Sequence, residues 1–326
     1  MATVKGFIRA YGAAVRRVER ERQREAREAA KRFKEQQKLQ AIEDAKIAVY
    51  NWNRYVQMLI SLHKNSSNAI DWNALKSQTK PVEPENQKQR EKSAIAKLKS
   101  YRPSWFDSLF KLTSKKVRRL ESKILEARSA DNEEYNQQKA DYENELNEWE
   151  SLQKLASGVQ SRNPEVYKEV MVYFDPFSDI KELATSIDFS FDSESADVDL
   201  HINEIDVIPN EEFKLTSTGK LSRKAMAKSK FYELYQDHVC SCVLRVALEL
   251  FALFPISHVR IHAMTKLLNP KTGHLEVKPI LSVLIPPETI RSLNLDKIDP
   301  SESMRNFKHN MSFKKTIGFS QVEKIN

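Results

Sequence analysis

The spacing of apolar residues separates a long polar helical stretch at the start of the chain from a more apolar second half. Residues 4–63 contain no proline and predict one long helix, whose first two thirds are polar on every side. Such a segment is either an exposed strut or needs a partner helix. After residue 40 apolar residues recur at helical spacing, which predicts a face that packs. They are Ile42, Ala45, Val49, Trp52, Val56, Leu59 and Ile60.

Residues 65–160 predict further helices separated by breaks. Residues 65–84 form a linker with one short helix capped by Asp71, and a helix follows over 85–101. A short amphipathic piece is expected at 105–112, before a third helix over 114–155. The third helix carries an apolar seam that predicts a coiled-coil arm. The seam contains Val117, Leu120, Ile124 and Ala127, and then Tyr135, Tyr142 and Trp149 at heptad spacing.

From residue 161 the pattern is typical of an α/β domain. The clearest strand is predicted at 196–202, where apolar and polar residues alternate. Further elements are expected as helices at 164–174, 175–184, 221–254, 287–293 and 301–309, and as strands at 187–191, 212–216, 259–266, 275–285 and 311–316. Asn269 to Gly273 would form the turn of a hairpin.

The stretch 239–254 is apolar on almost every side, although Arg245 and Glu249 interrupt it. It is too short to cross a bilayer, so it predicts the buried axis of the C-terminal domain. An unpaired charge inside a core is strongly unfavourable. Since Arg245 and Glu249 lie four residues apart, we expect them to form an ion pair there.

These elements predict an α+β protein with two domains. Residues 1–160 would form long-helix, coiled-coil arms, and residues 161–326 an α/β domain with a small mixed sheet around a long buried helix. The chain has six glycines among 326 residues, which favours long helices. Cys240 and Cys242 point in different directions on one helix and cannot bridge, so we expect a reduced, cytoplasmic compartment. No segment is long enough to span a membrane, and no membrane partner is expected.

Positive charge is concentrated in the helical arms. Residues 1–64 hold 15 Lys and Arg against 7 Asp and Glu, and residues 88–128 hold 13 against 4. Basic helices neutralise a nucleic-acid backbone without reading its sequence. The candidate contact residues are Arg16, Arg17, Arg20, Arg24, Arg27, Lys115, Lys116, Arg118, Arg119, Lys220, Arg223 and Lys224. Alternatively, the first arm would pair internally with the acidic segment 129–160, which holds 2 basic against 8 acidic residues.

A second pattern concerns acidic residues on neighbouring predicted strands. Asp199 lies on the alternating strand, and Glu212-Phe213-Lys214 follows it. Together with the order helix, three strands, long helix, strand, this resembles the core of PD-(D/E)xK nucleases over residues 163–265. The resemblance implies catalytic roles for Asp199, Glu212 and Lys214, and a Mg²⁺ ion held by Asp197, Asp199 and Glu212. An ordinary amphipathic strand with a solvated face explains the same residues.

Three functional hypotheses follow from the sequence. The first is a non-enzymatic protein that binds nucleic acid or a partner, needs no cofactor, and self-associates or contacts a partner protein through its arms within a larger assembly. The second is the Mg²⁺-dependent nuclease, which would make the protein an enzyme. The third is a purely structural subunit whose charges are used in protein contacts.

Overall fold

The computed structural model describes residues 4–105, 112–178 and 184–326, apart from the side chains of residues 4–16, 18, 26, 184 and 185. Most of the amphipathic piece expected at 105–112, and the latter half of the helix expected at 175–184, lie outside the described residues. The chain divides into two compact units. The first unit comprises Met1–Asn68, Asp175–Ala252 and Ile256–Asn326, and the second comprises Ala69–Phe174 and Leu253–Pro255. The first helix therefore belongs to the same unit as the sheet.

The fold is α+β, as predicted, with long helices first and a mixed sheet in the C-terminal part. The helices of the first unit are α1 (Val4–Ile60), α7 (Lys228–Leu253, whose last residue falls in the second unit), α8 (Pro287–Ser292) and α9 (Pro300–Ser303), with 3₁₀ turns at Leu62–Asn65, Ile205–Val207 and Met304–Asn306. Its strands are β1 (Ala184–Phe191), β2 (Ser195–Ile202), β3 (Glu211–Leu215), β4 (Leu221–Ala225), β5 (His258–Leu268), β6 (Leu275–Ile285), β7 (Lys308–Lys314) and β8 (Gly318–Ser320).

Six of the strands form one sheet in the order β1-β2-β5-β6-β7-β8. Only β2 and β5 run parallel, and the chain between them passes through α7. β3 and β4 pair with each other in a separate two-stranded sheet. The expected hairpin around Asn269 to Gly273 is confirmed as β5 and β6.

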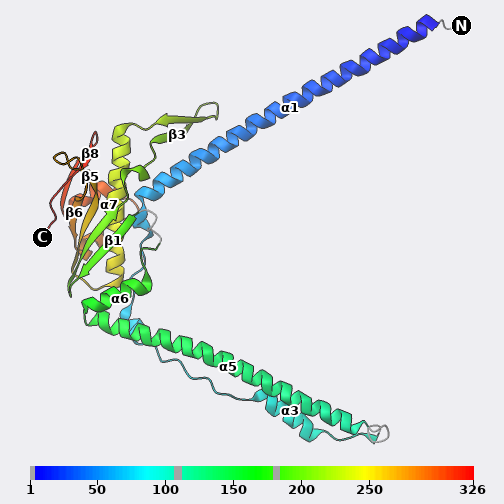
Figure 1. The fold of residues 1–326 in the computed structure, drawn as a ribbon, viewed down its shortest axis with the longest axis vertical. Helices are drawn as coiled ribbons and strands as arrows, with labels where there is room; N and C mark the ends of the chain where they lie inside the picture. Colours follow the sequence, from blue (N-terminus) through cyan, green and yellow to red (C-terminus); the bar gives the residue numbers. More distant parts are fainter. Residues whose placement is uncertain (1–3, 106–111, 179–183) are drawn as a thin grey trace. The chain divides into compact units, whose positions relative to one another are not determined.

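α7 lies along the six-stranded sheet (Figure 1) and forms the axis of its core. From Val239 to Phe254 every residue is buried except Leu248, which is half-buried. The inward-facing residues of β2 and β5, including Val198 and Ile261, are fully buried. Burial of a side chain of this size contributes about 1.5–3 kcal/mol. The predicted buried helix is therefore confirmed.

One side of α7 carries polar residues that hold the chain leaving α1. His238 Nδ1 lies 3.0 Å from the backbone oxygen of Leu59. One turn further along, Ser241 Oγ lies 2.9 Å from His63 Nδ1. These contacts satisfy polar groups that would otherwise be costly to bury, so they fix the end of α1 to α7.

Arg245 and Glu249 continue this set of contacts. Arg245 Nε lies 2.8 Å from Glu249 Oε1, with both side chains buried, so the predicted ion pair is confirmed. The guanidinium also donates to the backbone oxygen of Asn65, and Glu249 Oε1 accepts the N–H of Ser67 at 2.8 Å. The two charges thus bind each other and the segment that follows α1.

The start of α7 differs from the prediction. The helix begins at Lys228 instead of near Leu221, because Leu221–Ala225 forms β4. Ser, Arg, Lys and Ala in this stretch favour a helix locally, but pairing with β3 overrides that preference. Gly219, with φ +78°, makes the tight turn between the two strands. Similarly, residues 308–309 were expected to be helical but belong to β7, which pairs with β6.

In the second unit, α3 (Gln89–Ser100) lies beside α5 (Thr113–Gln160) (Figure 1). Asp131 of α5 accepts the backbone N–H of Arg90 at 3.3 Å and of Glu91 at 2.8 Å, and so caps the N-terminus of α3. Arg128 and Glu91 form an ion pair of 2.6 Å between the helices. The residues of the predicted seam in this region, Val117, Leu120, Ile124 and Ala127, are half-buried.

Beyond α3, the seam of α5 contacts other segments of the same unit. α2 (Trp72–Lys76) is capped by Asp71, as predicted, and packs on α5. Trp149 donates its indole N–H to the backbone oxygen of Gln78 at 3.0 Å. α6 (Pro164–Phe174) follows α5, and Gly158 permits their close contact, since a Cβ at this position would lie 2.5 Å from Val166. An extended chain therefore covers part of the aromatic seam.

Candidate nucleic-acid interface

The hairpin formed by β3 and β4 packs onto the C-terminal part of α1. Trp52 donates its indole N–H to the backbone oxygen of Glu211 at 2.8 Å, and its ring stacks with Phe213 at a centroid distance of 6.5 Å. Tyr55, one turn later, donates its hydroxyl to the backbone oxygen of Val207 at 2.9 Å. These contacts join residues more than 150 positions apart in the sequence and hold the base of the hairpin against α1.

The tip of the hairpin also contacts α1. A Cβ placed on Gly219 would lie 3.3 Å from Cγ2 of Ile42, so the backbone of the turn lies directly against that side chain. Ile42 precedes Trp52 by ten residues, which corresponds to about 15 Å of helix. The hairpin therefore runs along α1 with its tip toward the N-terminus of the helix.

The face of α1 that receives the hairpin continues toward the N-terminus as a row of basic residues. Residues three or four positions apart share a helix face, and the positions that pack, from Ile42 to Val56, follow this spacing. One path with this spacing before Ile42 passes through seven exposed basic side chains: Lys38, Lys34, Lys31, Arg27, Arg24, Arg20 and Arg17. Glu21, Glu28 and Glu35 lie three or four positions from members of this row and flank it on one side, whereas Glu19 and Glu25 lie farther around the helix.

The hairpin carries three further cations, of which Lys220 lies nearest to this row. Lys220, Arg223 and Lys224 are exposed, and no ion pair to any of them is recorded within the described residues. The guanidinium carbon of Arg223 lies 4.9 Å from the centroid of the Phe213 ring, a cation–π contact that orients it. Lys220 follows Gly219 and therefore lies near Ile42, one turn from Lys38. We call the seven row residues together with Lys220, Arg223 and Lys224 the basic strip.

Comparison with protein-family models, with curated proteins and with solved structures finds no match. Within the described part of the chain, none of the helices has both the length and the apolar character needed to cross a bilayer. Evidence for function therefore comes from the residues of the basic strip and of the other candidate sites.

The structure brings together most of the basic residues predicted from the sequence. Seven of them, Arg17, Arg20, Arg24, Arg27, Lys220, Arg223 and Lys224, lie in the basic strip. The side chain of Arg16 lies outside the described set. Sequence reasoning missed Lys31, Lys34 and Lys38. Counting back from Ile42 in steps of three and four residues would have found them.

The remaining predicted basic residues belong to the second unit. Lys115, Lys116, Arg118 and Arg119 are exposed near the start of α5. The structure therefore divides the predicted contact residues into two groups, one in each compact unit.

The residues of the nuclease hypothesis lie on two different sheets. Asp197 and Asp199 are on β2 of the six-stranded sheet, whereas Glu212 and Lys214 are on β3 of the separate hairpin. The nuclease hypothesis expects the strand that carries Glu212 and Lys214 to lie beside β2 in one sheet. That strand, β3, is not part of the described six-stranded sheet. Its place beside β2 is taken by β5, which follows α7.

Each of these carboxylates already has a basic partner. Asp197 accepts from Arg260 NH2 at 2.6 Å, and this hydrogen bond lowers the pKa of Asp197. Asp199 pairs with Lys324 at 2.6 Å.

Glu212 forms ion pairs with Lys230 and with Lys214, and the distance to Lys214 is 3.0 Å. Hydrogen bonds from both lysines lower the pKa of Glu212. Among the described residues, no group of three His, Cys, Asp or Glu side chains is arranged to hold a metal ion. Lys214 therefore acts here as an ion-pair partner of Glu212.

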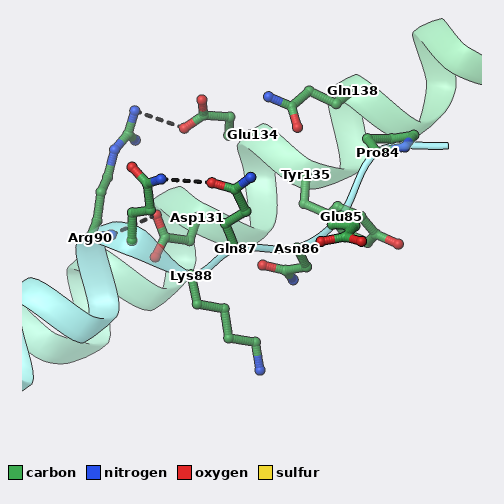
Figure 2. A pocket seen from close by; sticks show the side chains of 11 residues that line it. Pro84, Glu85, Asn86, Gln87, Lys88, Arg90, Asp131, Glu134, Tyr135 and Gln138 are labelled. Carbon is green, nitrogen blue, oxygen red and sulfur yellow. Dashed lines mark hydrogen bonds and ion pairs between the residues drawn. The ribbon is translucent and has the colours of Figure 1, made fainter. Parts of the chain in front are cut away.

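A polar pocket of about 410 Å³ lies in the second unit between the segment from Pro84 to Lys88 and α5 (Figure 2). Figure 2 shows Arg90 and Glu134 facing each other across one side of it, in an ion pair of 2.8 Å. Asp131, which also lines the pocket, is occupied in capping α3. The polar groups of this pocket thus serve the packing of α3 on α5.

Proposed function

We propose that this protein binds the phosphate backbone of nucleic acid through the basic strip, without catalysing a reaction, as part of a larger assembly. The observation that carries this proposal is the docking of the hairpin on α1, which brings a second group of exposed cations to this helix and places Lys220 next to the basic row. Arrangement on one face matters because a duplex can contact only one side of a helix at a time.

The dimensions of the row suit a duplex. From Arg17 to Lys38 the helix extends by about 32 Å, close to the length of one turn of B-DNA, about 34 Å. Duplex DNA carries one negative charge per about 1.7 Å of its axis, so phosphates are available along the whole row. The strip is dominated by long cationic side chains that contact phosphates, which supports binding without sequence preference.

Other exposed residues of α1 support contact with a further protein. Ile47, Tyr50 and Met58 are 51 %, 65 % and 42 % exposed and lie away from the face that receives the hairpin. Exposed apolar residues gathered on one side of a helix are typical of association surfaces. The long helix would then provide two faces, one for nucleic acid and one for another subunit.

Two charge reversals on α1 test the proposal against a matched control. Arg24→Glu with Lys31→Glu changes the row, whereas Arg22→Glu with Arg32→Glu makes the same change in charge at two exposed positions outside the row. Fluorescence anisotropy with a labelled random-sequence duplex should show about a tenfold or larger loss of affinity for the row variant. The control variant should stay within about twofold of the wild-type protein.

Absence of duplex binding by the wild-type protein would contradict the proposal. An equal loss in both double variants would also contradict it, because binding would then depend on net charge and not on the face. Circular dichroism of both variants should show unchanged helix content, since all four side chains are exposed.

A further inference from the structure

The start of α5 carries a second concentration of exposed positive charge. Lys115, Arg118 and Arg119 lie on the side of the helix away from the seam, Lys123 lies at the edge of the seam, and all four are exposed. No ion pair to any of them is recorded within the described residues. On α3, Lys97 lines a groove of about 560 Å³ together with Lys123. We call these five residues the second basic cluster.

The charge of α5 changes sign along its length. After the second basic cluster, residues 129–160 hold 2 basic against 8 acidic residues. Phosphates are attracted to the first part of α5 and repelled by the remainder. A polyanion would therefore contact this unit only at the end where α3 and α5 pack together.

The packing of α3 on α5 fixes this cluster in place. Asp131 caps α3, and Glu91 pairs with Arg128 at 2.6 Å. These two acidic groups at the interface of α3 and α5 are thus engaged with backbone N–H groups or with Arg128. These two acidic groups therefore do not neutralise the outward-facing lysines and arginines, which can bind an external partner.

From this geometry we infer that the protein bridges two nucleic-acid segments, with the basic strip on one and the second basic cluster on the other. The inference rests on the proposed function. In addition, the basic strip and the second basic cluster belong to different compact units of the chain. Each would therefore neutralise a separate set of phosphates. A single protein molecule would then connect two duplexes or two distant parts of one.

A two-duplex capture assay with the full chain tests this inference. An unlabelled random-sequence duplex is immobilised on beads, the protein is bound, and a fluorescent duplex is then added. The wild-type protein should retain fluorescence on the beads. Lys115→Glu with Arg119→Glu and Lys123→Glu should reduce that fluorescence to the level without protein, while the first duplex still binds the protein.

The matched control reverses the same number of charges elsewhere in the second unit, at Lys139, Lys154 and Lys168. This variant should capture the fluorescent duplex as well as the wild-type protein does. If the control loses capture to the same extent, bridging does not depend on the second basic cluster and the inference is overturned.

Four further outcomes would overturn the inference. If the wild-type protein binds the immobilised duplex but captures no second duplex, bridging fails while the proposed function stands. If it binds no duplex at all, the proposed function fails as well. If the variant with the reversed cluster still captures the second duplex, capture is caused by self-association of molecules bound through the basic strip. If the second basic cluster instead governs binding to anionic lipid vesicles, its partner is a membrane surface.

Discussion

α7 and α1 are both long helices that carry charged residues, yet they place those charges in opposite environments. On α7, Arg245 and Glu249 are buried, paired with each other and bonded to the backbone that follows α1. On α1, the cations from Arg17 to Lys38 are exposed. A buried charge must be neutralised inside the fold, whereas an exposed cation contributes little to folding. The difference assigns the charges of α7 to stability and those of α1 to binding.

The largest effect is expected when the buried pair is broken. Arg245→Ala leaves Glu249 as an uncompensated buried charge and should lower the free energy of unfolding by about 3–5 kcal/mol. Arg24→Ala on α1 should change it by less than about 0.5 kcal/mol. Urea denaturation followed by circular dichroism measures both. Similar losses for the two variants would remove the distinction between the helices.

Leucines on the two helices provide an uncharged version of the same test. Leu244 is fully buried, so Leu244→Ala should destabilise the protein by about 2–5 kcal/mol through reduced burial and the cavity left behind. Leu39 on α1 is 63 % exposed, and Leu39→Ala should cost less than about 0.5 kcal/mol. Thermal unfolding of both variants checks this, and a stable Leu244→Ala protein would argue against α7 as the core axis.

Such a core could be predicted from the sequence because residues 239–254 are apolar on almost every side and only burial satisfies that pattern. The ion pair of Arg245 and Glu249 followed from their spacing. The strand β4 could not be predicted, because its residues favour a helix locally and become a strand only through pairing with β3.

The basic strip was predictable only in part. Charge counting found Arg17 to Arg27 and the group around Lys220. It could not show that these groups share one surface, because their proximity depends on contacts such as Trp52 with Glu211 and Ile42 with Gly219. The separation of Asp199 from Glu212 has the same origin, since strand order in a sheet is set by tertiary pairing.

Release of the hairpin from α1 should have an intermediate, local effect. Trp52→Ala removes the hydrogen bond to Glu211 and the stacking on Phe213. Amide hydrogen exchange should accelerate in β3 and β4, corresponding to a decrease of about 1 kcal/mol in local stability, with no change in β2 or β5. Tyr50→Ala, at a residue 65 % exposed, is the control. Uniform acceleration across both sheets would contradict this assignment.

The smallest effect concerns the pH dependence of an ion pair on the sheet. The hydrogen bond from Arg260 lowers the pKa of Asp197 in the folded state. The pair therefore stabilises the fold above the unfolded pKa of about 3.9, and this contribution is lost as the pH falls through the folded pKa. Because both side chains are partly exposed, it should stay below about 1 kcal/mol.

Asp197→Asn isolates this contribution. The difference in unfolding free energy between the wild-type protein and the variant should be present at neutral pH and should shrink toward the acid end of a pH series. A difference that stays constant with pH would show that the ionised carboxylate of Asp197 is not what stabilises the fold.

The central claim, that the hairpin and α1 form one phosphate-binding surface, is tested most directly by the salt dependence of duplex affinity. Lys220→Ala with Arg223→Ala and Lys224→Ala removes the cations of the hairpin, and Lys271→Ala with Lys297→Ala and Lys308→Ala removes three exposed cations elsewhere in the first unit. The account predicts a steep loss of affinity with salt for the wild-type protein. The slope of log affinity against log salt concentration should become shallower by about 0.9 for each phosphate that the hairpin variant no longer neutralises, and should not change in the control. An identical slope for the wild-type protein and the hairpin variant would contradict the claim.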